Sequence, residues 1–253
     1  MIDLHSHLLP AVDDGSRSVE QSVRVLEQLA AQGITAVCLT PHLRSAELAA
    51  GPPPAHDRAY EALRAAAPAV PRLFRGAEVM LDRPLPLDSP EMRRCTLGGT
   101  SYLLVEFHRM VAFDTVCNAL TRVVQAGLRP VLAHPERYRS CSPEAVARWR
   151  ELGAAMQVDA TTLLAAQARG ERARALAARG LADILAADNH GDDRSLAAGR
   201  SFLEAQDAAE QADLLTTRNP LAILSDEPLL PVPPFELRRT WMQKLRKILE
   251  GGE

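Results

Sequence analysis

The chain lacks several features that would place it in a membrane or among disulfide-bonded proteins. No apolar run reaches eighteen residues, the length that a membrane-spanning helix needs. The cysteines Cys38, Cys95, Cys117 and Cys141 include no C-x-x-C pair and are too sparse for a disulfide framework. The first residues show neither the basic region nor the apolar region of a secretory signal. We therefore expect a cytoplasmic protein without a transmembrane segment.

An excess of charge of one sign is also missing. The 29 Lys and Arg residues nearly balance 32 Asp and Glu residues, which leaves a net charge of −3. Such a balance gives no general attraction to nucleic acid, and we expect no nucleic-acid partner. The 253 residues contain no internal repeat and no linker that would divide them. The sequence therefore predicts a single domain over residues 1–253.

What the chain does contain is a regular alternation of two patterns. Short apolar runs typical of buried strands alternate with Ala/Leu/Arg/Glu-rich stretches of helical spacing. The predicted strands are Ile2-Leu4, Thr35-Thr40, Leu73-Val79, Tyr102-Phe107, Pro130-Ala133, Ala155-Val158 and Ala182-Ala186. The predicted helices cover residues 18–32, 56–68, 112–126, 143–152, 160–179, 196–214 and 234–250. This alternation predicts an α/β fold with a mainly parallel sheet, which a domain of this size closes most economically as a barrel.

Candidate metal ligands stand at the ends of these predicted strands. His5 and His7 lie on one side of the first strand, because side chains alternate across its faces. Further histidines and carboxylates follow the later strands, and in a parallel barrel these strand ends meet at one mouth. These further residues are Asp14, His42, Glu78, Glu106, His134, Asp188 and His190. The proline- and glycine-containing segments 44–56 and 80–100 are predicted to be loops at that mouth.

The charges of this set indicate bound cations. Carboxylates gathered at one buried point need counter-charge to offset their repulsion and desolvation. A mixture of imidazole and carboxylate suits Zn, Mn or Fe, and the set is large enough for two or three ions. Of the remaining histidines, His56 is expected to be exposed to solvent and His108 to lie near the mouth, and neither is placed among the ligands.

Seven short motifs in this order resemble the PHP (polymerase and histidinol phosphatase) superfamily. The resemblance is closer to its bacterial protein-tyrosine phosphatase branch, which is associated with capsule and exopolysaccharide systems. The motifs are Met1-Ile2-Asp3-Leu4-His5-Ser6-His7, Val12-Asp13-Asp14-Gly15, Thr40-Pro41-His42, Gly76-Ala77-Glu78-Val79, Leu104-Val105-Glu106-Phe107, Ala133-His134-Pro135-Glu136-Arg137-Tyr138 and Asp188-x-His190.

The resemblance implies a distorted seven-stranded (β/α) barrel that carries a trinuclear site. One ion would be held by His5, His7, Glu78 and Asp188, a second by Glu78, Glu106 and His134, and a third by Asp14, His42 and His190. It further implies hydrolysis of phosphotyrosine through a metal-activated water, with Mn as the most favoured metal. The implied substrate is a phosphotyrosine protein, in particular the tail of a bacterial tyrosine kinase that controls polysaccharide export.

Two arginines are candidates for binding phosphate, because the planar guanidinium matches phosphate oxygens. Arg137 follows the candidate ligand His134 at the mouth, although an ion pair with Glu136 is the alternative. Arg194 follows His190 by four positions, whereas the family has a longer gap before its phosphate-binding arginine.

Two other functions stay open at this point. One is a small-molecule phosphatase such as histidinol phosphatase, and the other is a non-catalytic module that binds phosphotyrosine. A thiolate mechanism is disfavoured, although Cys38 and Arg44 have the Cys-x5-Arg spacing. The intervening segment has no glycine, Pro41 lacks an N–H donor, and Cys38 belongs to an apolar strand.

The end of the chain is predicted to form a basic amphipathic helix over residues 234–250. Packing against its own barrel is the favoured interpretation. A dimer contact is the alternative, which leaves a homo-oligomer open.

Overall fold

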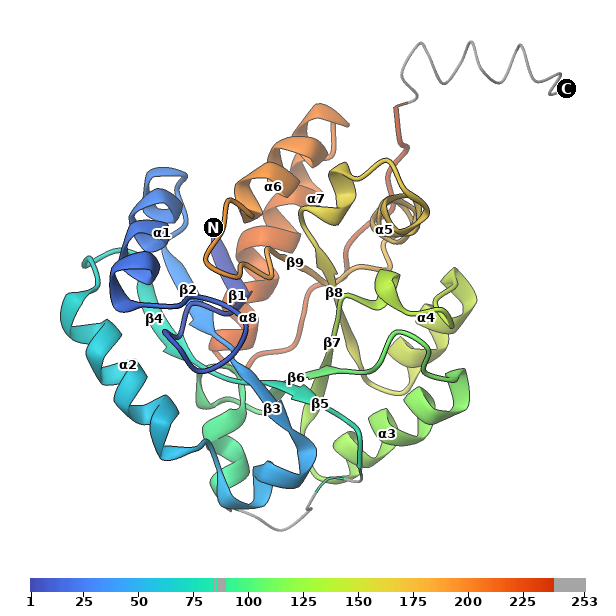
Figure 1. The fold of residues 1–253 in the computed structure, drawn as a ribbon. Coiled ribbons are helices and arrows are strands. Elements are labelled where there is room, and N and C mark those ends of the chain that lie inside the picture. The colour runs from blue at the N-terminus through green and yellow to red at the C-terminus, as the bar shows by residue number, and fades with distance from the viewer. Residues whose placement is uncertain (84, 86–89, 239–253) are drawn as a thin grey trace, which may run out of the picture.

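The computed structural model describes residues 1–83, 85 and 90–238. It has an α/β fold in which the strands lie at the centre and helices α1 to α6 surround them (Figure 1). The strands are β1 (Ile2–Ser6), β2 (Ala36–Leu39), β3 (His42–Arg44), β4 (Arg72–Arg75), β5 (Glu78–Met80), β6 (Tyr102–Glu106), β7 (Arg129–Ala133), β8 (Ala155–Asp159) and β9 (Ile184–Ala186).

The helices follow the strands along the chain. They are α1 (Val19–Ala31), α2 (Pro54–Ala66), α3 (Phe113–Gln125), α4 (Pro143–Glu151), α5 (Ala168–Ala178), α6 (Leu196–Ala205), α7 (Ala209–Asp213) and α8 (Asn219–Leu224). Short 3-10 turns cover Ser45–Ala50, Pro90–Cys95, Leu97–Gly99, Pro135–Arg137 and Thr162–Leu164, and a π-helical turn covers Leu214–Arg218.

Within the described ranges the strands form two parallel sheets, ordered β1-β2-β4 and β3-β5-β6-β7-β8-β9. A single parallel bridge from Ser6 to Asn189 joins the end of β1 to the segment after β9. The parallel sheet is confirmed, but the hydrogen bonds among the described residues form nine strands in two sheets and show no closed barrel of seven.

One predicted strand is interrupted and one observed strand was not predicted, which explains the difference. The predicted strand Thr35-Thr40 corresponds to β2, whereas β3 lies beyond it and follows Pro41, which has no N–H to donate. The Ala77 N–H donates to the carbonyl of Cys95 (2.9 Å) instead of to a neighbouring strand, and the third run breaks between β4 and β5.

Apolar side chains pack on both sides of the strands. The larger core lies between strands and helices and contains Leu26, Leu132 and Trp149. A second core is built from every other strand residue, including Leu104 of β6 and Ala155 of β8. Because side chains alternate, the face that forms this second core ends in polar residues at the carboxyl ends of the strands. On β6 this residue is Glu106, and on β8 these residues are Gln157 and Asp159.

The helix predictions are confirmed where local signals are strong. Ser18 caps α1 by accepting a hydrogen bond from the Gln21 amide, and Gly33 follows the helix with a positive φ of 85°. The predicted helix over 160–179 is wrong in its first part, where Asp159 binds the amides of Thr161 and Thr162 and forms a turn. The predicted helix over 196–214 is divided into α6 and α7.

Three further expectations concern single segments. His56 lies in α2 and is only 6% exposed, so the prediction of a solvent-exposed loop histidine is wrong. The expected helix over 234–250 falls largely on residues 239–253, outside the described residues, and residues 234–238 are not helical. Among the residues that the structure describes, none of the helices has the length and apolar character to cross a bilayer.

Candidate metal centre

His5 and His7 form the buried end of a tight group of ligand atoms. Their Nε2 atoms lie 3.2 Å apart, and both side chains are fully buried. Glu78 Oε2 lies 3.1 and 3.2 Å from these two nitrogens, and Asp188 Oδ1 lies 3.3 Å from each of them. Ligands of a tetrahedral ion with bonds of about 2.0–2.1 Å are separated by roughly 3.3–3.4 Å. The four atoms therefore have the spacing of a metal coordination shell.

The other ring nitrogens of these histidines contact hydrogen-bond acceptors. His7 Nδ1 lies 2.8 Å from Asp13 Oδ2, and His5 Nδ1 lies 2.9 Å from Gln157 Oε1. Each acceptor favours the tautomer with its proton on Nδ1, which leaves the lone pair of Nε2 for a metal. Asp13 and Gln157 are absent from the predicted site residues. The Asp13-Asp14 pair in the sequence could have indicated Asp13, whereas no local sequence pattern indicates Gln157.

Glu78 connects the first group to a second one. Its Oε2 atom lies 3.1 Å from His42 Nδ1, which in turn lies 3.1 Å from Glu106 Oε1. Its Oε1 atom lies 2.9 Å from His134 Nε2. The structure thus places His42 between Glu78 and Glu106, where the family resemblance implies His134.

A third group lies toward the surface. His42 Nε2 and His190 Nε2 each lie 3.5 Å from Asp14 Oδ1, and the Asp14 side chain is 70% exposed. The rings of His7 and His190 are 4.1 Å apart between centroids. Three sets of side chains therefore bring their ligand atoms within 4.8 Å of one another. The sets are His5, His7, Glu78 and Asp188, then His42, Glu78 and Glu106, then His7, Asp14, His42 and His190.

The charges of these histidines and carboxylates stabilise one another. Burial favours the neutral carboxyl of Asp188, but His5, His7 and Arg137 outweigh burial and hold its pKa far below the usual value. Burial also opposes a charge on His5, yet Glu78 and Asp188 raise its pKa. The buried carboxylates thus require positive charge beside them, which protons on imidazoles or bound cations can supply.

Two candidate ligands have strained backbones. His134 has a φ of 35° and Asp188 a φ of 51°, both in the left-handed region that non-glycine residues avoid. Such strain costs on the order of 1–3 kcal/mol and is concentrated at functional sites. The Gln157 side chain, which also contacts His5, accepts a hydrogen bond from the His134 amide (3.3 Å). The strain therefore falls on residues that surrounding contacts hold in place.

Both candidate phosphate-binding arginines reach the edge of the centre. Arg137 Nη2 lies 2.6 Å from Asp188 Oδ2 and also contacts Asp159 Oδ2. Arg194 Nη1 lies 3.6 Å from Asp188 Oδ2, while its Nε donates to Asp192 (2.8 Å). Within the described part of the chain, the ion pairs of Arg137 are with Asp159 and Asp188, not with the alternative partner Glu136.

The thiolate alternative is excluded by burial. Cys38 is fully buried in β2, and burial raises the pKa of its thiol to about 12. Arg44 is exposed in β3. His108 is exposed and belongs to none of the three ligand sets.

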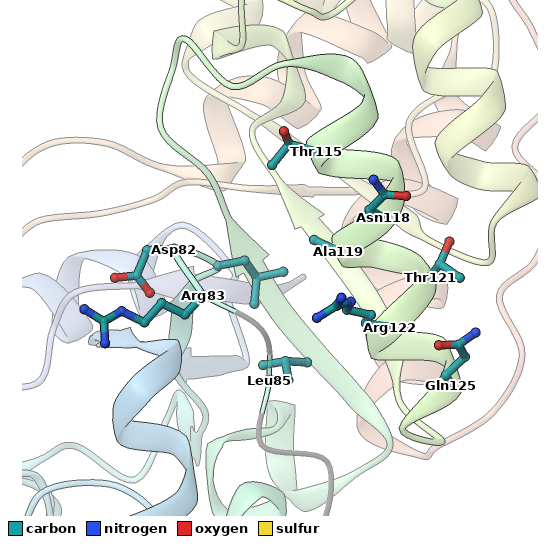
Figure 2. A pocket seen from close by; sticks show the side chains of 10 residues that line it. Asp82, Arg83, Leu85, Thr115, Asn118, Ala119, Thr121, Arg122 and Gln125 are labelled. Atoms are coloured by element: carbon teal, nitrogen blue, oxygen red, sulfur yellow. The ribbon is translucent and has the colours of Figure 1, made fainter.

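A cavity of about 580 Å³ lies beside α3, apart from the ligand sets. Thr115, Asn118 and Arg122 of α3 line one side of it and Leu85 lies on the other, while the Arg83 side chain extends away from α3 (Figure 2). None of the residues that line it belongs to the three sets. The cavity is therefore separate from the candidate ligand sets.

The donor set fits divalent cations. Asp188 Oδ1 and His134 Nδ1 are buried, and neither has a hydrogen-bond partner among the described residues. Buried polar atoms are nearly always paired, so an unpaired carboxylate oxygen between two imidazole nitrogens fits a position that binds a cation. Parallel strands whose carboxyl ends carry such a set define an α/β protein with a candidate metal centre.

Comparison with known proteins gives the family. The family model "Capsular polysaccharide synthesis, CpsB/CapC" matches residues 1–225. The chain therefore belongs to the CpsB/CapC family, and the predicted resemblance to phosphatases of capsule systems is confirmed.

Individual relatives agree with this placement. The chain is 26% identical over 243 residues to the tyrosine-protein phosphatase CpsB of Streptococcus pneumoniae, covering 90% of this chain and 99% of that protein. It is 29% identical to the tyrosine-protein phosphatase YwqE of Bacillus subtilis, over 64% of this chain and 66% of that one.

The fold agrees as well. The chain matches a solved structure with a TM-score of 0.77. That structure belongs to a study of YwqE from Bacillus subtilis and CpsB from Streptococcus pneumoniae, described as unique metal-dependent tyrosine phosphatases. This match has 26% identity and covers 94% of this chain and all of the other. A dihydropyrimidinase from Brevibacillus agri shares the fold alone, with a TM-score of 0.52 and 12% identity over 92% of this chain and 73% of that one.

Proposed function

We propose that this protein is a metal-dependent protein-tyrosine phosphatase. The observation that carries the proposal is the convergence of His5, His7, Glu78 and Asp188, whose ligand atoms have the spacing of a coordination shell. Membership of the CpsB/CapC family and similarity to metal-dependent tyrosine phosphatases support the reaction.

We propose two or three divalent ions for this centre. One ion would be held by His5, His7, Glu78 and Asp188. A second ion would be held by Glu78, Glu106 and either His42 or His134. Asp14, His42 and His190 would hold the third. Mn is the favoured metal, while Fe and Zn suit the same ligand types.

The residues of the chain would bind and orient the substrate. When bound, the ions would neutralise the phosphate dianion and lower the pKa of water toward about 7. Arg137 and Arg194 would donate to the nonbridging phosphate oxygens and stabilise the charge that develops on them. A tyrosine phenolate is a fairly good leaving group, so the mechanism does not require a strong general acid.

The substrate would be a phosphotyrosine protein, and we propose the tail of a bacterial tyrosine kinase in polysaccharide regulation. Support comes from the capsular polysaccharide description of the family and the names of the relatives. We further propose that residues 1–253 act as a single domain in which the two sheets together make a distorted seven-stranded barrel. A cytoplasmic location stays a prediction, and the four free cysteines are in keeping with it.

The proposal is tested by removing metal with a chelator and adding back Mn, Fe or Zn separately, with elemental analysis of each sample. Hydrolysis of a phosphotyrosyl peptide should be lost after chelation and restored by metal add-back. Glu78→Gln should lower kcat/KM on the order of 100-fold or more, because Glu78 contacts both inner ligand sets. Glu204→Gln, on the exposed side of α6, is the matched control.

Two outcomes would contradict the assignment. A strong preference for histidinol phosphate over the peptide would indicate a small-molecule phosphatase. No turnover of any phosphomonoester by the Mn-loaded protein would indicate a non-catalytic binding module.

A further inference from the structure

Asp159 is a buried carboxylate that contacts Arg137 but lies outside the three ligand sets. It ends β8 and is 2% exposed. Its Oδ2 atom accepts a hydrogen bond from Arg137 Nη2. Burial opposes the charge of Asp159, but the Arg137 guanidinium and the hydroxyl of Thr161 hold its pKa below the usual value. Asp159 is therefore a fixed negative charge beside the arginine.

The second oxygen of Asp159 is held by its own loop. Oδ1 accepts hydrogen bonds from the Thr161 amide (2.8 Å), the Thr161 hydroxyl (2.7 Å) and the Thr162 amide (3.1 Å). These three donors leave the carboxylate little freedom to rotate. The Asp159 carboxylate is therefore a hydrogen-bond acceptor of fixed orientation for Arg137.

Arg137 is shared between Asp159 and a candidate metal ligand. Both Asp159 and Asp188 accept from the same nitrogen, Nη2. Among the described residues, Nε is buried without a hydrogen-bond partner, and neither carboxylate occupies Nη1. Nη1 thus retains N–H groups that can donate hydrogen bonds to a phosphate.

From this geometry we propose that Asp159 is a positioning residue that holds Arg137 in the orientation that binds the substrate phosphate. The inference rests on the proposed phosphatase function. With cations bound by Asp188 Oδ1 and its neighbours, Asp188 would be a weaker partner for Arg137, and Asp159 would keep the guanidinium at the mouth. Asp159 acts through Arg137 and does not itself touch the substrate.

The test is Asp159→Asn in the metal-loaded, full-length protein. The amide keeps an oxygen for the Thr161 and Thr162 donors but loses the charge that orients Arg137. We expect the KM for a phosphotyrosyl peptide and the Ki for inorganic phosphate to rise together by about 10-fold to 100-fold, as for a lost charge-assisted hydrogen bond. Metal content should stay at the wild-type value.

The matched control is Asp183→Asn. Asp183 is likewise buried, at 5% exposed, and pairs with an arginine, Arg150 (2.8 Å), but precedes β9 at the opposite end of the sheet. It should lose stability without a change in the phosphate Ki. If Asp159→Asn does not fold, Thr161→Val removes one of the hydrogen bonds to Asp159 and should raise the phosphate Ki in the same direction, by a smaller factor.

A double-variant comparison separates positioning from packing. In an Arg137→Ala background, Asp159→Asn should raise the phosphate Ki no further, because its effect passes through Arg137. Additive effects, an unchanged Ki in Asp159→Asn, or a loss of metal in that variant would each overturn the inference. Failure of the wild-type protein to hydrolyse phosphotyrosine would instead refute the proposed function, so the two failures are distinguishable.

Discussion

Single side chains at this site depend on partners that hold them. His7 is oriented by Asp13, whose carboxylate accepts hydrogen bonds from His7 Nδ1 (2.8 Å) and from the His42 amide (3.1 Å). Burial favours the neutral acid, but the hydrogen bond from His7 lowers the Asp13 pKa to about 2. Asp13 is therefore ionised at neutral pH, and this contribution to stability is present above pH about 4 and lost as the pH falls toward 2.

Replacing Asp13 by Asn should weaken metal binding by about 10-fold to 100-fold, because the partner of a metal-ligating histidine orients the ring and raises its basicity. Titration of the apo protein with Mn, followed by calorimetry, measures this effect. Asp114→Asn, at an exposed position in the first turn of α3, is the control. Equal affinities in the two variants would show that Asp13 does not act on His7.

Cys38→Ser should retain hydrolysis of a phosphotyrosyl peptide within a few-fold of the wild-type kcat/KM. The thiol is fully buried and its pKa is raised to about 12 by burial, so at pH 8 it stays protonated and unreactive. Iodoacetamide treatment of the native protein should likewise leave activity unchanged. Loss of activity in a folded Cys38→Ser protein would restore the thiolate mechanism.

At the scale of elements, local signals determine helix ends and long-range contacts determine where strands break. The capping serine and following glycine of α1 lie within the helix region itself, so its bounds could be predicted. The break between β4 and β5 depends on Cys95, which is far from Ala77 in sequence. The residue pattern within 73–79 gives no indication of that contact.

The cap of α1 can be measured directly. Ser18→Ala removes the acceptor for the Gln21 amide (3.2 Å) and should lower the free energy of unfolding by about 1 kcal/mol. Urea denaturation checks the value. Ser201→Ala, at an exposed position inside α6, should change stability by less than about 0.5 kcal/mol. Similar losses in both variants would mean that the cap contributes nothing specific.

The whole molecule brings together groups that span most of the chain. His5 and Asp188 are 3.3 Å apart in space, although 183 positions separate them. Only the curvature of parallel strands around a common core brings their carboxyl ends to one point. The buried carboxylates gathered there should make the fold more stable when cations are bound.

Removing metal should therefore lower the midpoint of thermal unfolding by about 5–10 °C, the effect of an ion present at roughly 100 times its Kd. Differential scanning calorimetry with chelator and after Mn add-back measures this shift. A His5→Ala/His7→Ala variant lacks two ligands of the proposed inner ion, and its midpoint should fall less on chelation than that of the wild-type protein. An unchanged midpoint in the wild-type protein would count against a metal centre.

The sequence by itself determined the residue types of the candidate site, because imidazoles and carboxylates follow apolar strand runs that can be recognised locally. The alternation of strands and helices determined a parallel α/β fold in the same way. Only the tertiary structure decided that His42 lies between Glu78 and Glu106, and that Gln157 contacts His5 and Asp159 contacts Arg137. These are distances between segments remote in sequence, and they depend on strand register and packing, which no local pattern encodes.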